Sequence, residues 1–376
     1  MKILITHNRY KNLGRQVSSH KYTLFKDSAN KLILYFGILP WIVSNIKNSE
    51  LHASKKYKLV GSIPSLSSFS LLWRDYDVFI DRNIFSLSTV FHLLISSIRF
   101  KMRGVIVKEW FWRNENIVAK MNNYVAKYFT SLLVNFYISY SKKSTSFLLD
   151  ELGIAKKKIF EIPKPCEDYS NKQIDKSTLN FIRNRYFDED KLNIVNVNRL
   201  VLVKRVEILI KSVKDMEGIN LILVGDAHGD YARSCKELSK ESKADITFTG
   251  RISSEEVVYF YRAADLYVQP NKYCPEEFEP AEIWGSVVDE AMSLELPVIV
   301  TTATGCADDL VKGKNSGLIV KQGDIKALRD AIQDFLDSPK VWEKRGQNAR
   351  KAFLQKNERS REGYKRLAET LEHSSI

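Results

Sequence analysis

The sequence predicts an α/β protein with two Rossmann-like domains, each built on a parallel sheet. Strand-like runs alternate with helical stretches through the second half, and this alternation implies a parallel sheet that is covered on both faces. Residues 2–6 form a strand-like run that leads into a loop carrying Gly14, which is the first unit of a similar sheet. The chain of 376 residues is long enough for two domains of ordinary size.

In the first half, further strands are predicted at residues 57–60, 78–80, 104–108, 134–139 and 158–163. The spacing of apolar residues predicts helices over residues 85–98, 117–132 and 142–152. Glu109 directly follows the strand at 104–108. Because ligands of open α/β sheets collect beyond the carboxyl ends of the strands, Glu109 is a candidate binding residue.

In the second half, strands are predicted at residues 193–197, 220–224, 246–249, 266–269, 297–301 and 318–320. A polar stretch after Pro163 predicts a boundary, so we expect domains at residues 1–165 and 191–340, joined by a linker at 166–190. Residues 341–376 are polar and helical in character, and we expect them to cross back to the first domain.

The composition limits which classes of protein are compatible with this sequence. The four cysteines and six histidines are scattered, which predicts neither a disulfide framework nor a zinc site. The longest apolar run, residues 32–43, is interrupted by Pro40 and is shorter than the roughly 18 to 20 residues that span a bilayer. We therefore expect a cytoplasmic protein.

Positive charge is concentrated in the first half of the chain. Residues 1–170 hold 26 Lys and Arg against 12 Asp and Glu, and the whole chain has a net charge of +13. This asymmetry indicates an anionic partner, and we expect the inner face of a membrane, contacted peripherally. A solvated basic surface without a partner is the alternative. Nucleic acid is not expected, because no nucleic-acid-binding motif accompanies the charge.

Two carboxylates, Glu282 and Glu290, flank a predicted helix start at Gly285. The first amides of a helix lack intrahelical partners and favour anions such as phosphate. Arg199 follows the strand at 193–197, and Lys204 begins the next helix, so both lie on the ligand side of the sheet. Together these residues predict a site for a diphosphate with hydroxyl-bearing groups beside it. An ordinary capped helix with two solvated acids is the alternative.

Several motifs occur in a fixed order along residues 190–340: Asn198-Arg199-Leu200 with Lys204, Leu223-Val224-Gly225-Asp226, Phe248-Thr249-Gly250-Arg251, Glu282-x7-Glu290 and Gly305-Cys306-Ala307-Asp308-Asp309. In this order they resemble the donor domain of the retaining GT-B glycosyltransferases of family 4 (glycosyl transferases group 1). The resemblance implies a GT-B fold, whose two parallel sheets face a central cleft. The first domain would bind the acceptor, and the second domain the nucleotide-sugar.

The resemblance also implies a role for each site residue. Arg199 and Lys204 would neutralise the donor diphosphate as the sugar–phosphate bond breaks, and Glu282 would contact the transferred sugar. No cofactor or metal would be needed, because side chains and helix amides stabilise the leaving group. The other donor-binding residues implied by the resemblance would be Gly14, Gly250, Arg251, Gly285, Ser286, Val287 and Glu290, and Glu109 is added from its place after the strand at 104–108.

The expected function is therefore a metal-independent, retaining, hexosyltransferase-type transfer from a nucleoside-diphosphate sugar to a glycan or lipid-linked acceptor in glycan assembly. Two departures from the family pattern keep alternatives open. Family members often carry a histidine where Glu109 stands, and the paired glycines of the first loop are reduced to Gly14. The alternatives are a non-catalytic nucleotide-sugar-binding partner subunit and a nucleotide-sugar epimerase on the same fold.

Overall fold

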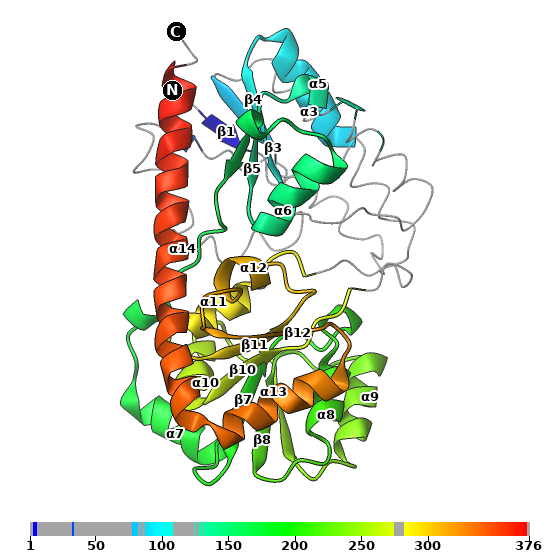
Figure 1. The fold of residues 1–376 in the computed structure, drawn as a ribbon, viewed down its shortest axis with the longest axis vertical. Helices are drawn as coiled ribbons and strands as arrows, with labels where there is room; N and C mark the ends of the chain where they lie inside the picture. Colours follow the sequence, from blue (N-terminus) through cyan, green and yellow to red (C-terminus); the bar gives the residue numbers. More distant parts are fainter. Residues whose placement is uncertain are drawn as a thin grey trace, which may run out of the picture. The chain divides into compact units, whose positions relative to one another are not determined.

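The computed structural model describes residues 3–5, 32–33, 77–81, 84, 87–107, 124, 128–129, 131–273 and 282–373. The chain divides into two compact units, Pro163–Arg359 and a unit made of Met1–Ile162 with Ser360–Ile376 (Figure 1). Two predicted site residues, Gly14 and Glu109, lie outside the described residues, as does the predicted strand at 57–60.

The described part of the first unit contains a parallel sheet in the strand order β2-β1-β3-β4-β5-β6. Its strands are β1 (Ile3–Ile5), β2 (Leu32–Ile33), β3 (Val78–Asp81), β4 (Met102–Val107), β5 (Phe136–Ser139) and β6 (Ile159–Glu161). Its helical segments include α3 (Leu87–Ile98), α5 (Ser131–Leu133), α6 (Lys142–Ser146) and the π-helix η5 (Phe147–Glu151). The sheet confirms the predicted parallel α/β architecture of the first half.

Successive residues of these strands enter different cores, because side chains alternate across a strand. In β3, Phe79 packs in a core with α3 and η5. Val78 and Ile80 pack in a second core, which includes Tyr364 and Leu367. Those two residues belong to α14 (Pro339–His373), whose residues from Ser360 onward belong to this unit.

The second unit contains a parallel sheet in the strand order β12-β11-β10-β7-β8-β9. Its strands are β7 (Leu192–Val197), β8 (Ile219–Val224), β9 (Asp245–Gly250), β10 (Leu266–Gln269), β11 (Val298–Thr301) and β12 (Gly317–Val320). Its α-helices are α7 (Lys176–Tyr186), α8 (Val206–Val213), α9 (Asp230–Ser239), α10 (Val257–Ala263), α11 (Ser286–Met292), α12 (Ala307–Leu310), α13 (Ile325–Asp337) and the first part of α14.

Both faces of this second sheet are covered by helices (Figure 1). Val195 and Val197 of β7 belong to a core with residues of α7, α10, α11 and α12. Ile194 of the same strand belongs to a core with residues of α8, α9 and α13. Burial on both faces is the reason that these strands read as nearly continuous hydrophobic runs in the sequence.

The segment predicted as a linker, residues 166–190, lies within the second unit and contains α7. Asp175 caps this helix, and its carboxylate accepts a hydrogen bond of 2.8 Å from the Thr178 amide. Ile182 is the buried residue of α7, so the apolar face of this helix is narrow and its sequence resembles that of a polar loop. Among the described helices, none combines the length and the apolar character needed to cross a bilayer.

Candidate functional site

Three strands of the second sheet end close together. The Gly225 amide after β8 donates a hydrogen bond of 3.1 Å to the carbonyl of Gly250 at the end of β9. A Cβ atom on Gly225 would lie 2.0 Å from the carbonyl oxygen of Asn198, and Gly225 has a φ of +141°. Only glycine permits this approach. The ends of β7, β8 and β9 therefore converge, with the exposed Arg199 and Arg251 following β7 and β9.

The structure brings two of the predicted catalytic residues into direct contact. The Lys204 ammonium, at the end of the 3-10 helix η8 (Leu202–Lys204), forms an ion pair with the Glu282 carboxylate. Each side chain is 17% exposed, so the pair is partly open to solvent. A lysine and a carboxylate that are close, charged and partly open can each exchange the partner for a ligand group: phosphate for Lys204, hydroxyl for Glu282.

A chain of buried amide side chains lies behind this ion pair. Asn271 lies 3.5 Å from a Glu282 carboxylate oxygen, and its own amide oxygen accepts a hydrogen bond from Gln269. Gln269 in turn accepts a hydrogen bond of 2.9 Å from Asn198 at the end of β7. Asn271 and Gln269 are fully buried. Satisfied polar networks of this kind hold side chains in one arrangement, so the amides fix the position of Glu282.

The amide chain was not predicted from the sequence. Its signal is the presence of polar residues where buried strands end, in Asn196-Val197-Asn198 and Gln269-Pro270-Asn271. A search for amides at the carboxyl ends of neighbouring strands would have found it.

The segment from Glu282 to Gly285 is held against the loop that follows β11. Glu282 pairs with Thr304 in a parallel bridge, and the Cys306 amide donates a hydrogen bond of 2.8 Å to the Trp284 carbonyl. A Cβ atom on Gly305 would lie 1.9 Å from the Ile283 carbonyl oxygen, so this contact requires glycine. Close packing of these two backbone segments thus fixes the position of the Glu282 backbone.

The predicted helix start is confirmed as α11, whose N-cap residue Gly285 has a φ of +95°. Ser286 and Val287, in its first turn, are half-buried, and the Ser286 hydroxyl forms a hydrogen bond with the Lys164 ammonium. Glu290, one turn later, accepts a hydrogen bond of 3.1 Å from the Tyr261 hydroxyl. Burial, the largest cause, raises the pKa of Glu290 to about 7.

Asp289 and Lys356 form a buried ion pair that the sequence analysis missed. The ammonium of Lys356, in α14, lies 2.9 Å from a carboxylate oxygen of Asp289, in α11. The two side chains are 1% and 0% exposed. The Trp284 indole donates to the other carboxylate oxygen of Asp289. Because both charges are buried and hydrogen-bonded, this pair stabilises the position of α11 and does not offer a group to a ligand.

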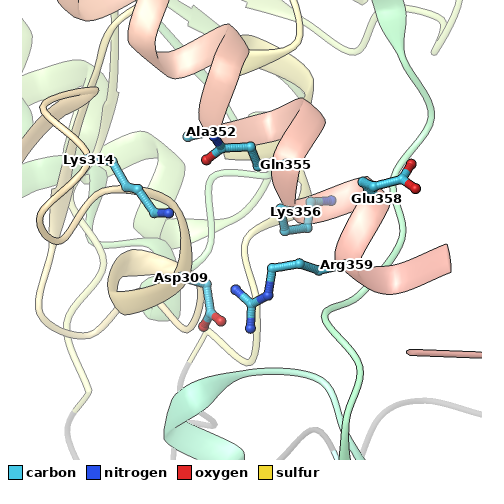
Figure 2. A pocket seen from close by; sticks show the side chains of 7 residues that line it. All are labelled: Asp309, Lys314, Ala352, Gln355, Lys356, Glu358 and Arg359. Atoms are coloured by element: carbon cyan, nitrogen blue, oxygen red, sulfur yellow. The ribbon is translucent and has the colours of Figure 1, made fainter. Parts of the chain in front are cut away.

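A cavity of about 280 Å³ lies elsewhere in the second unit (Figure 2). Side chains of α14 line one side of it, and Asp309 and Lys314 line the other (Figure 2). None of the residues predicted for the donor site lines this cavity. Volume alone therefore does not identify the site, and the chemistry at the strand ends is the stronger indication.

The chain is similar to glycosyltransferases. Residues 179–352 match the family model described as "Glycosyl transferases group 1". The capsular polysaccharide biosynthesis glycosyltransferase CapM of Staphylococcus aureus is 29% identical over 167 residues, which are 43% of this chain and 41% of CapM. The match thus covers less than half of the length of that relative. The uncharacterized glycosyltransferase MJ1069 of Methanocaldococcus jannaschii is 21% identical over 349 residues, which are 86% of this chain and 85% of that protein.

The fold has a solved counterpart. The crystal structure of Anabaena Alr3699/HepE in complex with UDP has a TM-score of 0.73 to this chain at 16% identity, covering 99% of both chains. At this identity the likeness concerns the fold. Residues 179–352 are thus similar to the glycosyl transferases group 1 family, and the chain has the GT-B fold.

Proposed function

We propose that the protein transfers a sugar from a nucleoside-diphosphate sugar to an acceptor. The observation that carries this proposal is the ion pair of Lys204 with Glu282, partly open to solvent, at the carboxyl ends of a doubly covered parallel sheet. Ligands of such sheets bind at that edge. The pair supplies one cation and one carboxylate, which are the groups that a diphosphate and a sugar hydroxyl require.

The chemistry proposed for the site is stabilisation of the leaving group. As the bond between the sugar and the diphosphate breaks, negative charge grows on the diphosphate, and Lys204 and Arg199 offset it. Glu282, released from Lys204, accepts hydrogen bonds from the sugar. The two cations perform the task that a metal ion performs in other transferases, so we propose that no metal is needed. The order of motifs, which resembles that of retaining enzymes, supports retention of the anomeric configuration.

A thermal-shift screen is the first test of this proposal. UDP-, GDP-, ADP- and dTDP-sugars are added in turn, and UDP-glucose comes first because an Anabaena HepE structure contains it. A ligand that binds the folded state raises the melting temperature by mass action. We expect one base to raise it, and less so in the Lys204→Ala variant. No shift with any of the four donors would contradict the proposal.

Turnover and stereochemistry are the second test. The donor that binds is incubated with the protein, with and without EDTA, and the anomer formed is identified by proton NMR. We expect consumption of the donor, retention of configuration and no effect of EDTA. Binding without any turnover would instead indicate a non-catalytic nucleotide-sugar-binding subunit.

We further propose that the acceptor is a glycan or a lipid-linked glycan at an anionic membrane surface. The support is the excess of basic residues in the first half of the chain and the name of the relative CapM, which refers to capsular polysaccharide biosynthesis. Flotation with liposomes containing an anionic lipid tests the membrane part. We expect binding at low salt that weakens as salt screens the charges. No binding at low salt would remove the membrane from the proposal.

A further inference from the structure

Lys164, shortly after β6, is a cation beside α11 that lies outside the motifs of the donor domain. Its ammonium hydrogen-bonds to the hydroxyl of Ser286 in the first turn of that helix. The Lys164 side chain therefore reaches a residue that the family resemblance implies in donor binding. Lys164 itself is half-buried.

The backbone of Lys164 is fixed more firmly than that of a typical surface lysine. Its carbonyl accepts a hydrogen bond of 3.0 Å from the buried ammonium of Lys356, which is also paired with Asp289 of α11. Pro163 and Pro165 flank Lys164, and a residue before proline is restricted to extended conformations. The side chain of Lys164 thus contacts α11 directly, and its carbonyl is held by Lys356 of α14, which pairs with Asp289 of α11.

The charges on α11 divide into two sets. The charge of Asp289 is matched by Lys356 inside the core. Ser286 and Glu290 are four residues apart, so they share one face of the helix, and Lys164 lies at that face. Burial raises the pKa of Glu290, whereas hydrogen bonds from tyrosines and the nearby charge of Lys164 act in the opposite direction. A ligand on this face therefore meets an ammonium, a hydroxyl and a carboxyl.

We propose that Lys164 is a further donor-binding residue, whose ammonium binds a phosphate oxygen of the nucleoside diphosphate held at the Ser286–Glu290 face of α11. A lysine acts toward phosphate as a point charge, and the bond is charge-assisted. The Ser286 hydroxyl, which now interacts with Lys164, is free to donate to the same phosphate once the ligand is bound. This inference rests on the proposed function, because that function places the donor at Glu282, just before α11.

Calorimetric titration of matched variants tests the inference. The ligand is whichever of UDP, GDP, ADP and dTDP the wild-type protein binds most tightly. Lys164→Met removes the charge and keeps the length of the side chain, and Lys164→Arg keeps the charge. Lys344→Met, which removes an exposed lysine of α14 in the same unit, is the control. Melting temperatures show whether each variant is folded.

We expect Lys164→Met to raise the Kd of the diphosphate about tenfold, as loss of one charge-assisted hydrogen bond predicts. Lys164→Arg should stay within about threefold of wild type, and Lys344→Met should not change the Kd. The Kd should also depend less on NaCl concentration in Lys164→Met than in wild type, because one screened attraction is gone. A purely structural role would leave that dependence unchanged.

Two outcomes would contradict the inference, and the experiment distinguishes between them. If wild type and Lys344→Met bind none of the four diphosphates, the proposed function fails, and this inference fails with it. If Lys204→Ala weakens binding while Lys164→Met leaves both the Kd and its salt dependence unchanged, the donor site stands and the role of Lys164 is wrong.

Discussion

Two lysine–carboxylate pairs end on the same short stretch of chain and differ in their exposure. Lys204 pairs with Glu282 just before α11, and each side chain is 17% exposed. Lys356 pairs with Asp289 inside α11, and these side chains are 1% and 0% exposed. In a sequence the two pairs look alike, because each consists of an acid near Gly285 and a distant lysine.

Burial decides what each pair is able to do. Removing one partner of a buried pair leaves an uncompensated charge in a medium that solvates it poorly. In a partly exposed pair, water or a ligand group can take the place of the partner that leaves. The buried pair therefore stabilises the site, and the open pair is suited to exchange partners with a substrate.

The largest expected effect is the loss of the buried pair. Lys356→Met should lower the free energy of unfolding by about 3 to 5 kcal/mol, because the buried Asp289 would lose the cation that pairs with it. Urea denaturation followed by circular dichroism measures this change. The control Lys344→Met, on the exposed face of the same helix, should stay within about 0.5 kcal/mol of wild type. Equal stability of the two variants would contradict the structural role of the buried pair.

The open pair should show the opposite behaviour. Lys204→Ala should lower donor turnover about 100- to 1000-fold, the range seen when a group that stabilises charge in the transition state is removed. Its free energy of unfolding should fall by less than that of Lys356→Met, because water reaches the Lys204–Glu282 pair. Steady-state kinetics and urea denaturation of one preparation measure both quantities. A variant that is as active as wild type, or one that is unfolded, would remove the distinction between the pairs.

Glu290, next to Asp289 in the chain, should make the free energy of unfolding depend on pH. Its folded pKa of about 7 lies above the ordinary value of 4.5, so the folded state binds the proton more tightly than the unfolded state. The contribution of Glu290 to the free energy of unfolding is fully present below pH 4.5 and is lost as the pH rises through 7. Between pH 5 and pH 8, wild type should lose about 2 to 3 kcal/mol more than Glu290→Gln. Parallel pH profiles of the two proteins would contradict the raised pKa.

The smallest expected effect concerns the backbone segment that carries Glu282. Gly305→Ala places a Cβ atom 1.9 Å from the Ile283 carbonyl and displaces the segment that carries Glu282. We expect about 1 to 3 kcal/mol of destabilisation and a loss of donor turnover. Gly313→Ala is the matched control, because Gly313 has a φ of +70° with no atom near its Cβ position. It should strain the backbone and leave turnover unchanged, and equal turnover in both variants would contradict the role of Gly305.

The fold could be predicted, and so could Lys204 and Glu282 as separate site residues, because their signals are local; the contact between these two residues, 78 positions apart, could not. Alternating strands and helices, the glycine at the start of α11 and the acids around it are each visible within a few residues. The buried pair could not be predicted in this way. Lys356 lies in a long polar helix, where a lysine normally indicates a solvated face, and only tertiary packing brings it to Asp289. The helix α7 was predicted as part of a linker because its sequence is mostly polar and its burial also depends on tertiary packing.

The most direct test of the central claim is a pair of calorimetric titrations of the Glu282→Gln variant. One uses the nucleoside-diphosphate sugar that wild type binds, and the other uses the same nucleoside diphosphate without the sugar. If Glu282 meets the sugar and Lys204 meets the phosphate, Glu282→Gln should weaken binding of the donor about tenfold relative to wild type. The same variant should bind the diphosphate at least as tightly as wild type, because Lys204 has lost a competing partner. An equal loss for both ligands, or no loss for either, would contradict this assignment of the pair.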